Sequence, residues 1–199
     1  DNNFYYALGG IKSVGYEAVS NIIKERIQNG KFKSINNFIN RVNSKDINKL
    51  QLEGLVKAGA FDNLNDNRQA LFNSIPNFIL KSKNIFDNKV ANQINLFAPD
   101  KIKDDDIVNI IGDWKFEERL SKEFEAVGFF ISGHPLNQFK GLVDDYNIVE
   151  FNKFINNDIT EETNITATLL KIQEKKTQKG NSYAIVKFSD LSSVFELFI

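Results

Sequence analysis

The spacing of apolar residues changes once along this chain, from the helical period to the strand period, and this change limits the possible folds most. In the helical segments up to about residue 160, apolar side chains recur every three or four positions, as between Tyr16 and Gln28. From Ile165 onward they alternate with polar residues, as in SYAIVKFSD. The sequence therefore predicts a mainly α-helical chain with a small C-terminal antiparallel sheet.

Glycine and capping residues divide the first helical part into short segments. Helices are predicted from Tyr16 to Gln28, from Ser34 as an N-cap, from Asn48 to Ala58, and from about Asp66 onward. Pro76 lies inside the last of these patterns, so we expect it to kink or shorten that helix. Residues 81–105 lose the period and are rich in lysine, asparagine and aspartate, which predicts an exposed loop.

A second helical part and three strands follow this loop. One stripe predicts a helix ending at Gly128, and Pro135 then stands near the first position of another helix. Strands are predicted in ITATLLKIQEKK, SYAIVKFSD and SVFELFI, with turns at Lys179-Gly180-Asn181 and Leu191-Ser192-Ser193. Because three strands leave an unpaired edge, we expect them to open a larger β-domain.

Composition excludes several classes of function. The chain has 199 residues, a formal net charge of −1, no cysteine and one histidine, so we predict no disulfide scaffold and no metal site. It has no apolar run of about 18 residues and no secretory signal at its start, so we expect a cytoplasmic protein that does not bind membranes. The missing initial methionine suggests a piece of a longer polypeptide. Since the charges balance, any contact with nucleic acid must be local.

The segment GGIKSVGYEAVSNIIKER, residues 9–26, has the pattern of a helix-hairpin-helix. A turn at Gly15 would point backbone amides outward at a helix N-terminus, where a phosphate oxygen can bind. Lys12 adds charge without base specificity. The candidate DNA-binding residues are Lys12, Ser13, Val14, Gly15 and Tyr16. The alternative is an ordinary capped helix, because Ser13 stands where such hairpins usually have their first glycine.

A second segment, NKLQLEGLVKAGAFDNLNDNRQALF, repeats the order of helix, glycine turn and helix. Its candidate DNA-binding residues are Gly59 and Ala60 at the turn and Arg68 in the first turn of the next helix. Two hairpins in tandem can hold both strands of a duplex by their backbones. Such binding is independent of base sequence and sensitive to salt.

The chain contains, in order, the blocks ALGGIKSVGYEAVSNIIKER, FKSINNFINRV, LEGLVKAGAFDNL, NRQALF and ERLSKEFEAVGFFISGHPL. Together these blocks resemble segments of the bacterial replicative DNA polymerase III alpha subunit, and KAGAFD and GFFISGHPL are the most specific. The resemblance covers nearly the whole chain. It implies a DNA-directed DNA polymerase, a nucleotidyltransferase, whose active site and Mg²⁺ lie upstream. No catalytic residue and no cofactor are therefore expected in this segment.

The resemblance also gives a role to the predicted loop. NQINLFAPD is an apolar patch between polar runs, and an extended peptide of this kind can place two apolar anchors in a pocket on a partner. In the family this loop carries a sliding-clamp-binding peptide of the form Gln-x-x-Leu-Phe. The residues that match are Gln93, Ile94, Asn95, Leu96 and Phe97. The alternative is that Leu96 and Phe97 only pin the loop to its own domain.

The strands look like the opening of the family's OB domain, which implies a contact with single-stranded template DNA. OB folds bind single strands with basic and aromatic side chains on one sheet face. The candidates around the first hairpin are Lys175, Lys176, Lys179 and Tyr183. A lysine-rich hairpin can equally be a solvated edge that prevents aggregation.

Three other features favour a structural interpretation. Asp104, Asp105 and Asp106 are consecutive carboxylates in a polar loop, which are usually only solvated. His134 in SGHPL is predicted to cap or pack, and Trp114 to anchor the second helical part to the first. A metal-dependent nuclease using Asp62 or the three loop aspartates is the least favoured hypothesis.

The sequence thus predicts four parts of a mainly α-helical fold. They are a tandem helix-hairpin-helix DNA-binding domain (1–80), a linker with the clamp motif (81–112), a helical connector (113–160) and the first strands of a truncated OB domain (161–199). The predicted function is non-catalytic binding of duplex DNA and the sliding clamp, in contact with other replicase subunits, which supports processive synthesis by the parent enzyme. The alternative function is a protein-interaction module that binds the clamp without significant DNA binding.

Overall fold

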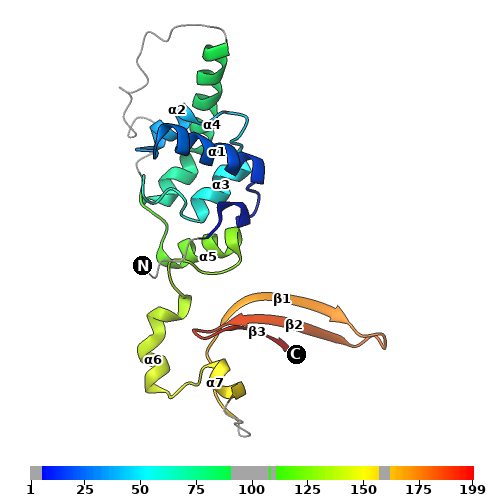
Figure 1. Ribbon diagram of the computed structural model, residues 1–199. Coiled ribbons are helices and arrows are strands. Elements are labelled where there is room, and N and C mark those ends of the chain that lie inside the picture. The colour runs from blue at the N-terminus through cyan, green and yellow to red at the C-terminus, as the bar shows by residue number, and fades with distance from the viewer. Residues whose placement is uncertain (1–5, 91–107, 109–110, 157–161) are drawn as a thin grey trace. The chain divides into compact units, whose positions relative to one another are not determined.

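The chain forms two compact units, Asp1–Ile131 and Ser132–Ile199. The computed structural model describes residues 6–90, 108, 111–156 and 162–199 (Figure 1). Within these ranges, no helix combines the length and the apolar character needed to cross a lipid bilayer. The first unit is helical, and the second joins short helices to the predicted sheet.

In the described part, the helices of the first unit are η1 Leu8–Gly10, α1 Tyr16–Asn29, α2 Ile35–Arg41, α3 Lys49–Lys57, α4 Arg68–Val90 and α5 Phe116–Val127. Two of them, α2 and α3, begin with a capping side chain. Ser34 caps α2 by accepting a hydrogen bond from Asn37 N at 3.1 Å. Asn48 and Gln51 form a reciprocal capping box at the start of α3. Local sequence therefore sets these helix starts.

One apolar core joins these helices. Leu71 and Ile75 of α4 are almost completely buried in it, and Ala126 of α5 belongs to the same cluster. The ring of Trp114 lies 5.6 Å from that of Phe72 and is also buried in this core. The prediction that Trp114 anchors the second helical part to the first is confirmed for α5.

Helix α4 continues past Pro76 to Val90, so the prediction that this proline shortens the helix is wrong. A proline inside a helix costs roughly 3 kcal/mol. Ile75 and Phe78 are buried on either side of it, and burial of two such side chains contributes a similar amount, about 1.5–3 kcal/mol each. The loop predicted from residue 81 is also wrong over residues 81–90, because Ile85 packs against the core and extends the helix.

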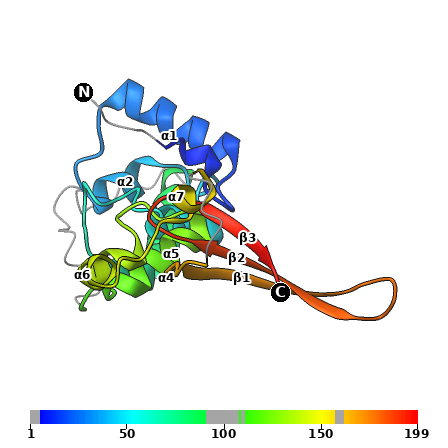
Figure 2. The same cartoon turned by 90° about the horizontal axis from the view of Figure 1, so that it is seen from below.

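The second unit contains the predicted sheet, in the order β1-β2-β3 with antiparallel pairing. The strands are β1 Thr168–Lys176, β2 Ser182–Ser189 and β3 Val194–Phe198. Val186 in the middle strand pairs with Ile172 and Leu197. Because β3 pairs only with residues 185–189, the far end of the β1–β2 hairpin is two-stranded and extends beyond β3 (Figures 1 and 2).

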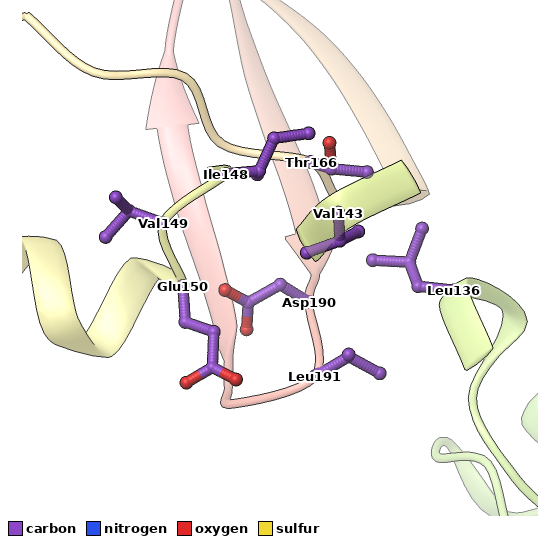
Figure 3. A pocket seen from close by; sticks show the side chains of 8 residues that line it. All are labelled: Leu136, Val143, Ile148, Val149, Glu150, Thr166, Asp190 and Leu191. Atoms are coloured by element: carbon purple, nitrogen blue, oxygen red, sulfur yellow. The ribbon is translucent and has the colours of Figure 1, made fainter. Parts of the chain in front are cut away.

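Asp190 fixes the turn between β2 and β3 to a short helix. The helices of this unit are the 3-10 helix η4 Pro135–Phe139, α6 Lys140–Asp145 and α7 Phe151–Asn156. The Asp190 carboxylate accepts hydrogen bonds from the amides of Phe151, Ser192 and Ser193 at 2.6–2.8 Å. Burial alone would raise the pKa of Asp190, but these bonds lower it below its ordinary value. Figure 3 shows this carboxylate among mainly apolar neighbours, so the corner is a structural one.

The boundary between the units lies inside the segment 113–160 that the sequence analysis treats as one connector. Helix α5 packs on α3 and belongs to the first unit, because its apolar stripe faces the first core. The helices η4, α6 and α7 belong to the second unit. By packing, the chain thus divides within the predicted connector, and the functional division into four parts stays a prediction.

Candidate nucleic-acid interface

The first hairpin turn has its left-handed residue at Ser13, with φ +66°. The amide of Val14 donates to Ile11 O at 3.2 Å inside the turn, and the amide of Lys12 donates to Ala126 O at 2.9 Å. The turn is thus fastened both to itself and to the end of α5. It is a rigid base for the residues that follow.

Gly15 plays a different part from the one predicted, because it has an ordinary extended conformation, with φ −72°. It is the N-cap of α1 and has no side chain to bond to the amides of the first helical turn. These amides are therefore left open to a ligand by the nature of the cap. A Cβ at this position would meet only Gln51 Nε2, at 3.5 Å, so neither φ nor space demands glycine.

Four of the five predicted residues of this hairpin are at the surface. Lys12, Ser13 and Gly15 are exposed, and the side chain of Tyr16 is 84% exposed. Val14 is the exception, since it is buried in the helical core. The prediction that Val14 contacts DNA is therefore wrong for its side chain. This apolar side chain packs into the core instead.

Helix α3 approaches this turn very closely at Gly54. A Cβ on Gly54 would lie 2.8 Å from the carbonyl oxygen of Lys12 and 3.3 Å from the side chains of Ile11 and Val14. Only glycine lets the backbones meet at this distance. The position of the first hairpin is thus set by α3 as well as by α5.

The second hairpin also has the predicted left-handed glycine, because Gly59 has φ +76°. A Cβ here would overlap the guanidinium of Arg68. Ala60, which follows, is exposed, and Asp62 lies in the same turn. The glycine turn therefore exists, and the missing side chain at Gly59 leaves the space that the Arg68 guanidinium occupies.

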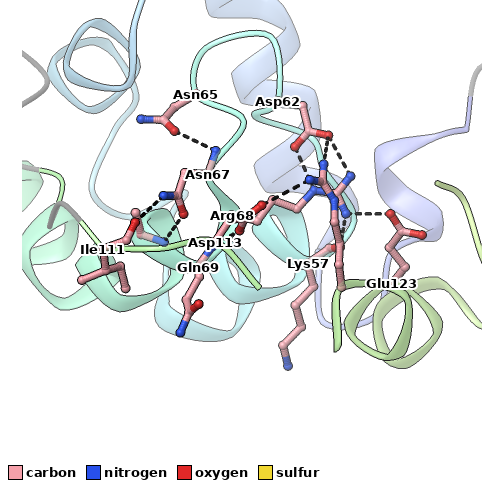
Figure 4. Close-up of polar contacts among 11 residues, drawn as sticks. Lys57, Asp62, Asn65, Asn67, Arg68, Gln69, Ile111, Asp113 and Glu123 are labelled. Atoms are coloured by element: carbon pink, nitrogen blue, oxygen red, sulfur yellow. Dashed lines mark hydrogen bonds and ion pairs between the residues drawn. The ribbon is translucent and has the colours of Figure 1, made fainter. Parts of the chain in front are cut away.

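Arg68 is an interior residue with 3% exposure, so the prediction that it contacts DNA is wrong. Its guanidinium donates to both carboxylate oxygens of Asp62 and to Glu123 Oε1 at 2.7–2.8 Å (Figure 4). It also donates to Lys57 O at 3.1 Å. Burial would lower the pKa of Arg68, but the bonds to Asp62 and Glu123 raise it above its ordinary value. Arg68 ties the second turn to α3 and α5.

The start of α4 is closed by side chains of the protein itself. Asn67 Oδ1 accepts from Ala70 N at 2.9 Å, and Asp113 Oδ1 accepts from Gln69 N at 3.0 Å (Figure 4). Asn67 Nδ2 also donates to Ile111 O at 2.6 Å. A carboxylate therefore already occupies the place where a phosphate would bind, and the second hairpin lacks the open amides of the first.

A groove with two lysines lies beside the first hairpin. It is lined by Lys12, Ser13, Leu50, Glu53, Gly54, Lys57, Glu125 and Ala126. Lys57 Nζ donates to Glu125 Oε1 at 2.8 Å, and this bond lowers the pKa of Glu125, with further help from the charges of Lys122 and Lys12. The sequence pattern does not point to Lys57 and Glu125, because they are 68 positions apart and meet only when α3 packs against α5.

In the sheet, the four residues predicted to bind a single strand do not share one face. Lys175 and Tyr183 are directly paired across β1 and β2, so their side chains lie together. Lys176 pairs with Ser182 and points to the opposite face. Lys179 lies in the turn between the strands. Lys187, opposite Lys171, adds positive charge on the face of Lys175.

His134 has the structural role that its sequence context predicts. Its Nδ1 accepts from Leu136 N at 3.1 Å and caps η4, and its Nε2 lies 3.0 Å from Ser189 Oγ. Because Nδ1 is an acceptor, the ring proton is on Nε2, and the ring cannot take a proton from Ser189. The pair is therefore no acyl-transfer dyad.

Two groups of predicted residues lie outside the described part of the chain. They are the peptide residues Gln93, Ile94, Asn95, Leu96 and Phe97, and the aspartates Asp104, Asp105 and Asp106. Among the described residues, no group of three or more histidine or carboxylate side chains is arranged to hold a metal ion. Two separate candidate sites remain: the first hairpin with the adjoining lysine groove in the first unit, and the Lys175–Tyr183 pair in the second.

Comparison with known proteins adds to this geometry. A family described as "Helix-hairpin-helix motif" matches residues 1–71, which include both hairpin turns. The chain is 34% identical over 204 residues to the DNA polymerase III subunit alpha of Rickettsia prowazekii, covering 100% of this chain and 17% of that protein. It is 32% identical to the same subunit of Borreliella burgdorferi, covering 94% of the chain and 17% of that protein.

A third relative agrees with these two. The DNA polymerase III subunit alpha of Campylobacter jejuni is 32% identical over 197 residues, covering 96% of the chain and 16% of that protein. The chain thus spans about a sixth of the length of the curated relatives it matches. Over its whole length, this chain is a homologue of one segment of the bacterial DNA polymerase III alpha subunit.

Proposed function

We propose that this segment holds the backbone of duplex DNA for a replicative polymerase. The observation that supports this most is the first hairpin, where Lys12, Ser13 and Tyr16 are exposed around the open amides at the start of α1. Amides and one ammonium group can hold a phosphate but cannot read bases. Binding should therefore be independent of base sequence.

The test is a titration of a labelled duplex with the 199-residue chain, followed by fluorescence anisotropy. Lys12→Glu should weaken binding about tenfold or more, because it puts a negative charge beside the phosphate. Lys83→Glu on the exposed side of α4 is the matched control and should bind like the parent. Equal loss in both variants would show that only net charge matters, and absence of binding by the parent would reject the proposal.

We propose further that polymerase activity belongs to a full-length polymerase subunit, in a part outside this segment. The relatives named as polymerase subunits are about six times longer than the part that matches. Primer extension by the isolated chain with Mg²⁺ should give no product. Extension above a no-protein control would overturn this assignment.

A sliding clamp is the proposed protein partner, through Gln93, Leu96 and Phe97. Support comes from the sequence pattern, in which an amide side chain precedes two adjacent apolar anchors. Saturable binding to a bacterial clamp should be lost in a Gln93→Ala/Phe97→Ala variant that still binds DNA. If the double variant binds the clamp equally well, the peptide is not the contact.

The sheet is proposed to contact single-stranded DNA through Lys175 and Tyr183. The antiparallel order β1-β2-β3 is compatible with the opening strands of an OB domain, and a lysine paired with an aromatic ring on one face suits a stacked strand. Tyr183→Ala should weaken binding of a short oligothymidine several-fold, since stacking contributes about 1–3 kcal/mol per base. Tyr146→Ala, at an exposed tyrosine of α6's C-terminal end, is the control.

A further inference from the structure

The groove beside the first hairpin holds a lysine that is positioned more firmly than a surface lysine. The side chain of Lys57 is only 13% exposed, and its ammonium lies 5.5 Å from the centre of the Phe72 ring. Its backbone carbonyl accepts a hydrogen bond from Arg68. Figure 4 shows the side chain directed away from Arg68. Lys57 is therefore held at its backbone carbonyl and at its ammonium, and it lines the groove.

The charged end of Lys57 is held by a carboxylate that is itself near the surface. Glu125 accepts from Lys57 Nζ at 2.8 Å and is 59% exposed. Lys122 and Lys12 also act on this carboxylate, and with Lys57 they lower the pKa of Glu125. Three positive charges thus surround one exposed negative group. This is the environment that a phosphate dianion or diester would also meet.

The groove is continuous with the proposed DNA contact. Lys12 and Ser13 of the first hairpin are among its lining residues, together with Gly54, where the backbones of α3 and the hairpin meet. The other carboxylate that lines it, Glu53, is near Lys49, at 3.8 Å. A DNA strand held by the hairpin amides would therefore pass next to Lys57.

We propose that this groove binds a second backbone phosphate of the DNA strand held by the first hairpin, with Lys57 as its cation and Glu125 as a competing anion. The inference rests on the proposed DNA-binding function and adds to it a new contact. In the absence of DNA, Glu125 holds the Lys57 ammonium in place. When DNA binds, the phosphate replaces the carboxylate on the same ammonium.

The test compares two variants in duplex titrations at several salt concentrations. Glu125→Gln should tighten binding about three- to fivefold, because it removes the competing charge. Lys57→Met, which keeps the stem on Phe72, should weaken binding about fivefold and reduce the slope of log K against log salt by about one. Glu118→Gln, an exposed carboxylate on the same helix, should change binding by less than either.

The outcomes separate this inference from the proposed function. If the unchanged chain binds and Lys12→Glu weakens binding about tenfold, while Glu125→Gln and Lys57→Met bind like the unchanged chain, the groove is not a phosphate site and the hairpin function stands. If Glu125→Gln and Glu118→Gln tighten DNA binding equally, Glu125 only repels DNA as any surface carboxylate does. That result would overturn its role as a competing anion. Since Glu125 is exposed, its variant should fold even if Lys57→Met does not.

Discussion

At position 13, a serine occupies a backbone conformation that suits glycine. A non-glycine residue with φ near +66° costs roughly 1–3 kcal/mol unless the surroundings compensate. The bonds from Lys12 N and Val14 N hold the turn in this shape despite that cost. The sequence pattern identified Ser13 as unusual, but it assigned the flexible turn to Gly15, which does not need it.

Ser13→Gly should raise the free energy of unfolding of the chain by about 0.5–1 kcal/mol. Relief of the strained φ outweighs the extra freedom that glycine has in the unfolded chain, about 0.4–1 kcal/mol. Urea unfolding followed by circular dichroism measures the change. Ser20→Gly, inside α1, is the control and should instead lower stability by a similar amount. A loss of stability in both would mean that the Ser13 side chain is needed.

The single histidine should make the second unit sensitive to acid. Burial lowers the pKa of His134, although the charge of Asp190 acts to raise it. In the unfolded chain the histidine has a pKa of about 6.5, so as the pH falls it takes up a proton before the folded chain does. Stability from the neutral ring is therefore full above about pH 6.5 and is lost as the pH falls from there through the folded pKa.

Thermal unfolding between pH 7.5 and 5 measures this effect. His134→Asn keeps an acceptor that can cap η4 but has no charge to gain, so its melting temperature should fall less than that of the parent over this range. Parallel curves for the two proteins would contradict the assignment. NMR signals of β2 amides near Ser189 give an independent titration.

At the scale of the elements, helices and strands followed from the sequence where local signals agreed. Caps at Ser34 and Asn48 and the alternation in SYAIVKFSD led to correct elements. The length of α4 was not predictable, because burial of Ile75 and Phe78 by distant segments outweighs the local effect of Pro76. For the same reason, the interior position of Arg68 depends on Glu123, which is 55 positions away.

The contact between α3 and the first hairpin gives a prediction at this scale. Gly54→Ala should lower the stability of the first unit by about 1 kcal/mol or more, since the clash with the Lys12 carbonyl outweighs the usual gain of about 1 kcal/mol for alanine in a helix. It should also weaken DNA binding, because the turn must shift. Gly141→Ala in α6, where the added Cβ meets nothing, is the control and should stabilise. Chemical denaturation of both variants decides between these outcomes.

At the scale of the whole molecule, net charge limits the proposed DNA binding. With a formal charge of −1, the chain has no long-range attraction for a polyanion, so affinity depends on the few contacts that the fold places together. The sequence predicts this local character and places the contact at the first hairpin, and both stay predictions. It did not predict the groove, because Lys57 and Glu125 meet only after α3 and α5 have packed.

The salt dependence of duplex binding should therefore be shallow. One phosphate at the hairpin and one in the groove give a slope of about −2 for log K against log salt, at roughly −0.9 per phosphate. Anisotropy titrations over a range of potassium chloride measure it. A much steeper slope would mean that further lysines, such as those of β1, hold the same DNA.

The hydrogen bonds at the start of α4 affect how the chain tolerates a change in its length. Asn67 and Gln69 hold Ile111 and Asp113, so the chain that leaves the end of α4 at Val90 returns to the beginning of the same helix. Both attachment points belong to one helix. We therefore expect the helices of the first unit to keep their packing when the length of the chain between Val90 and Ile111 is changed.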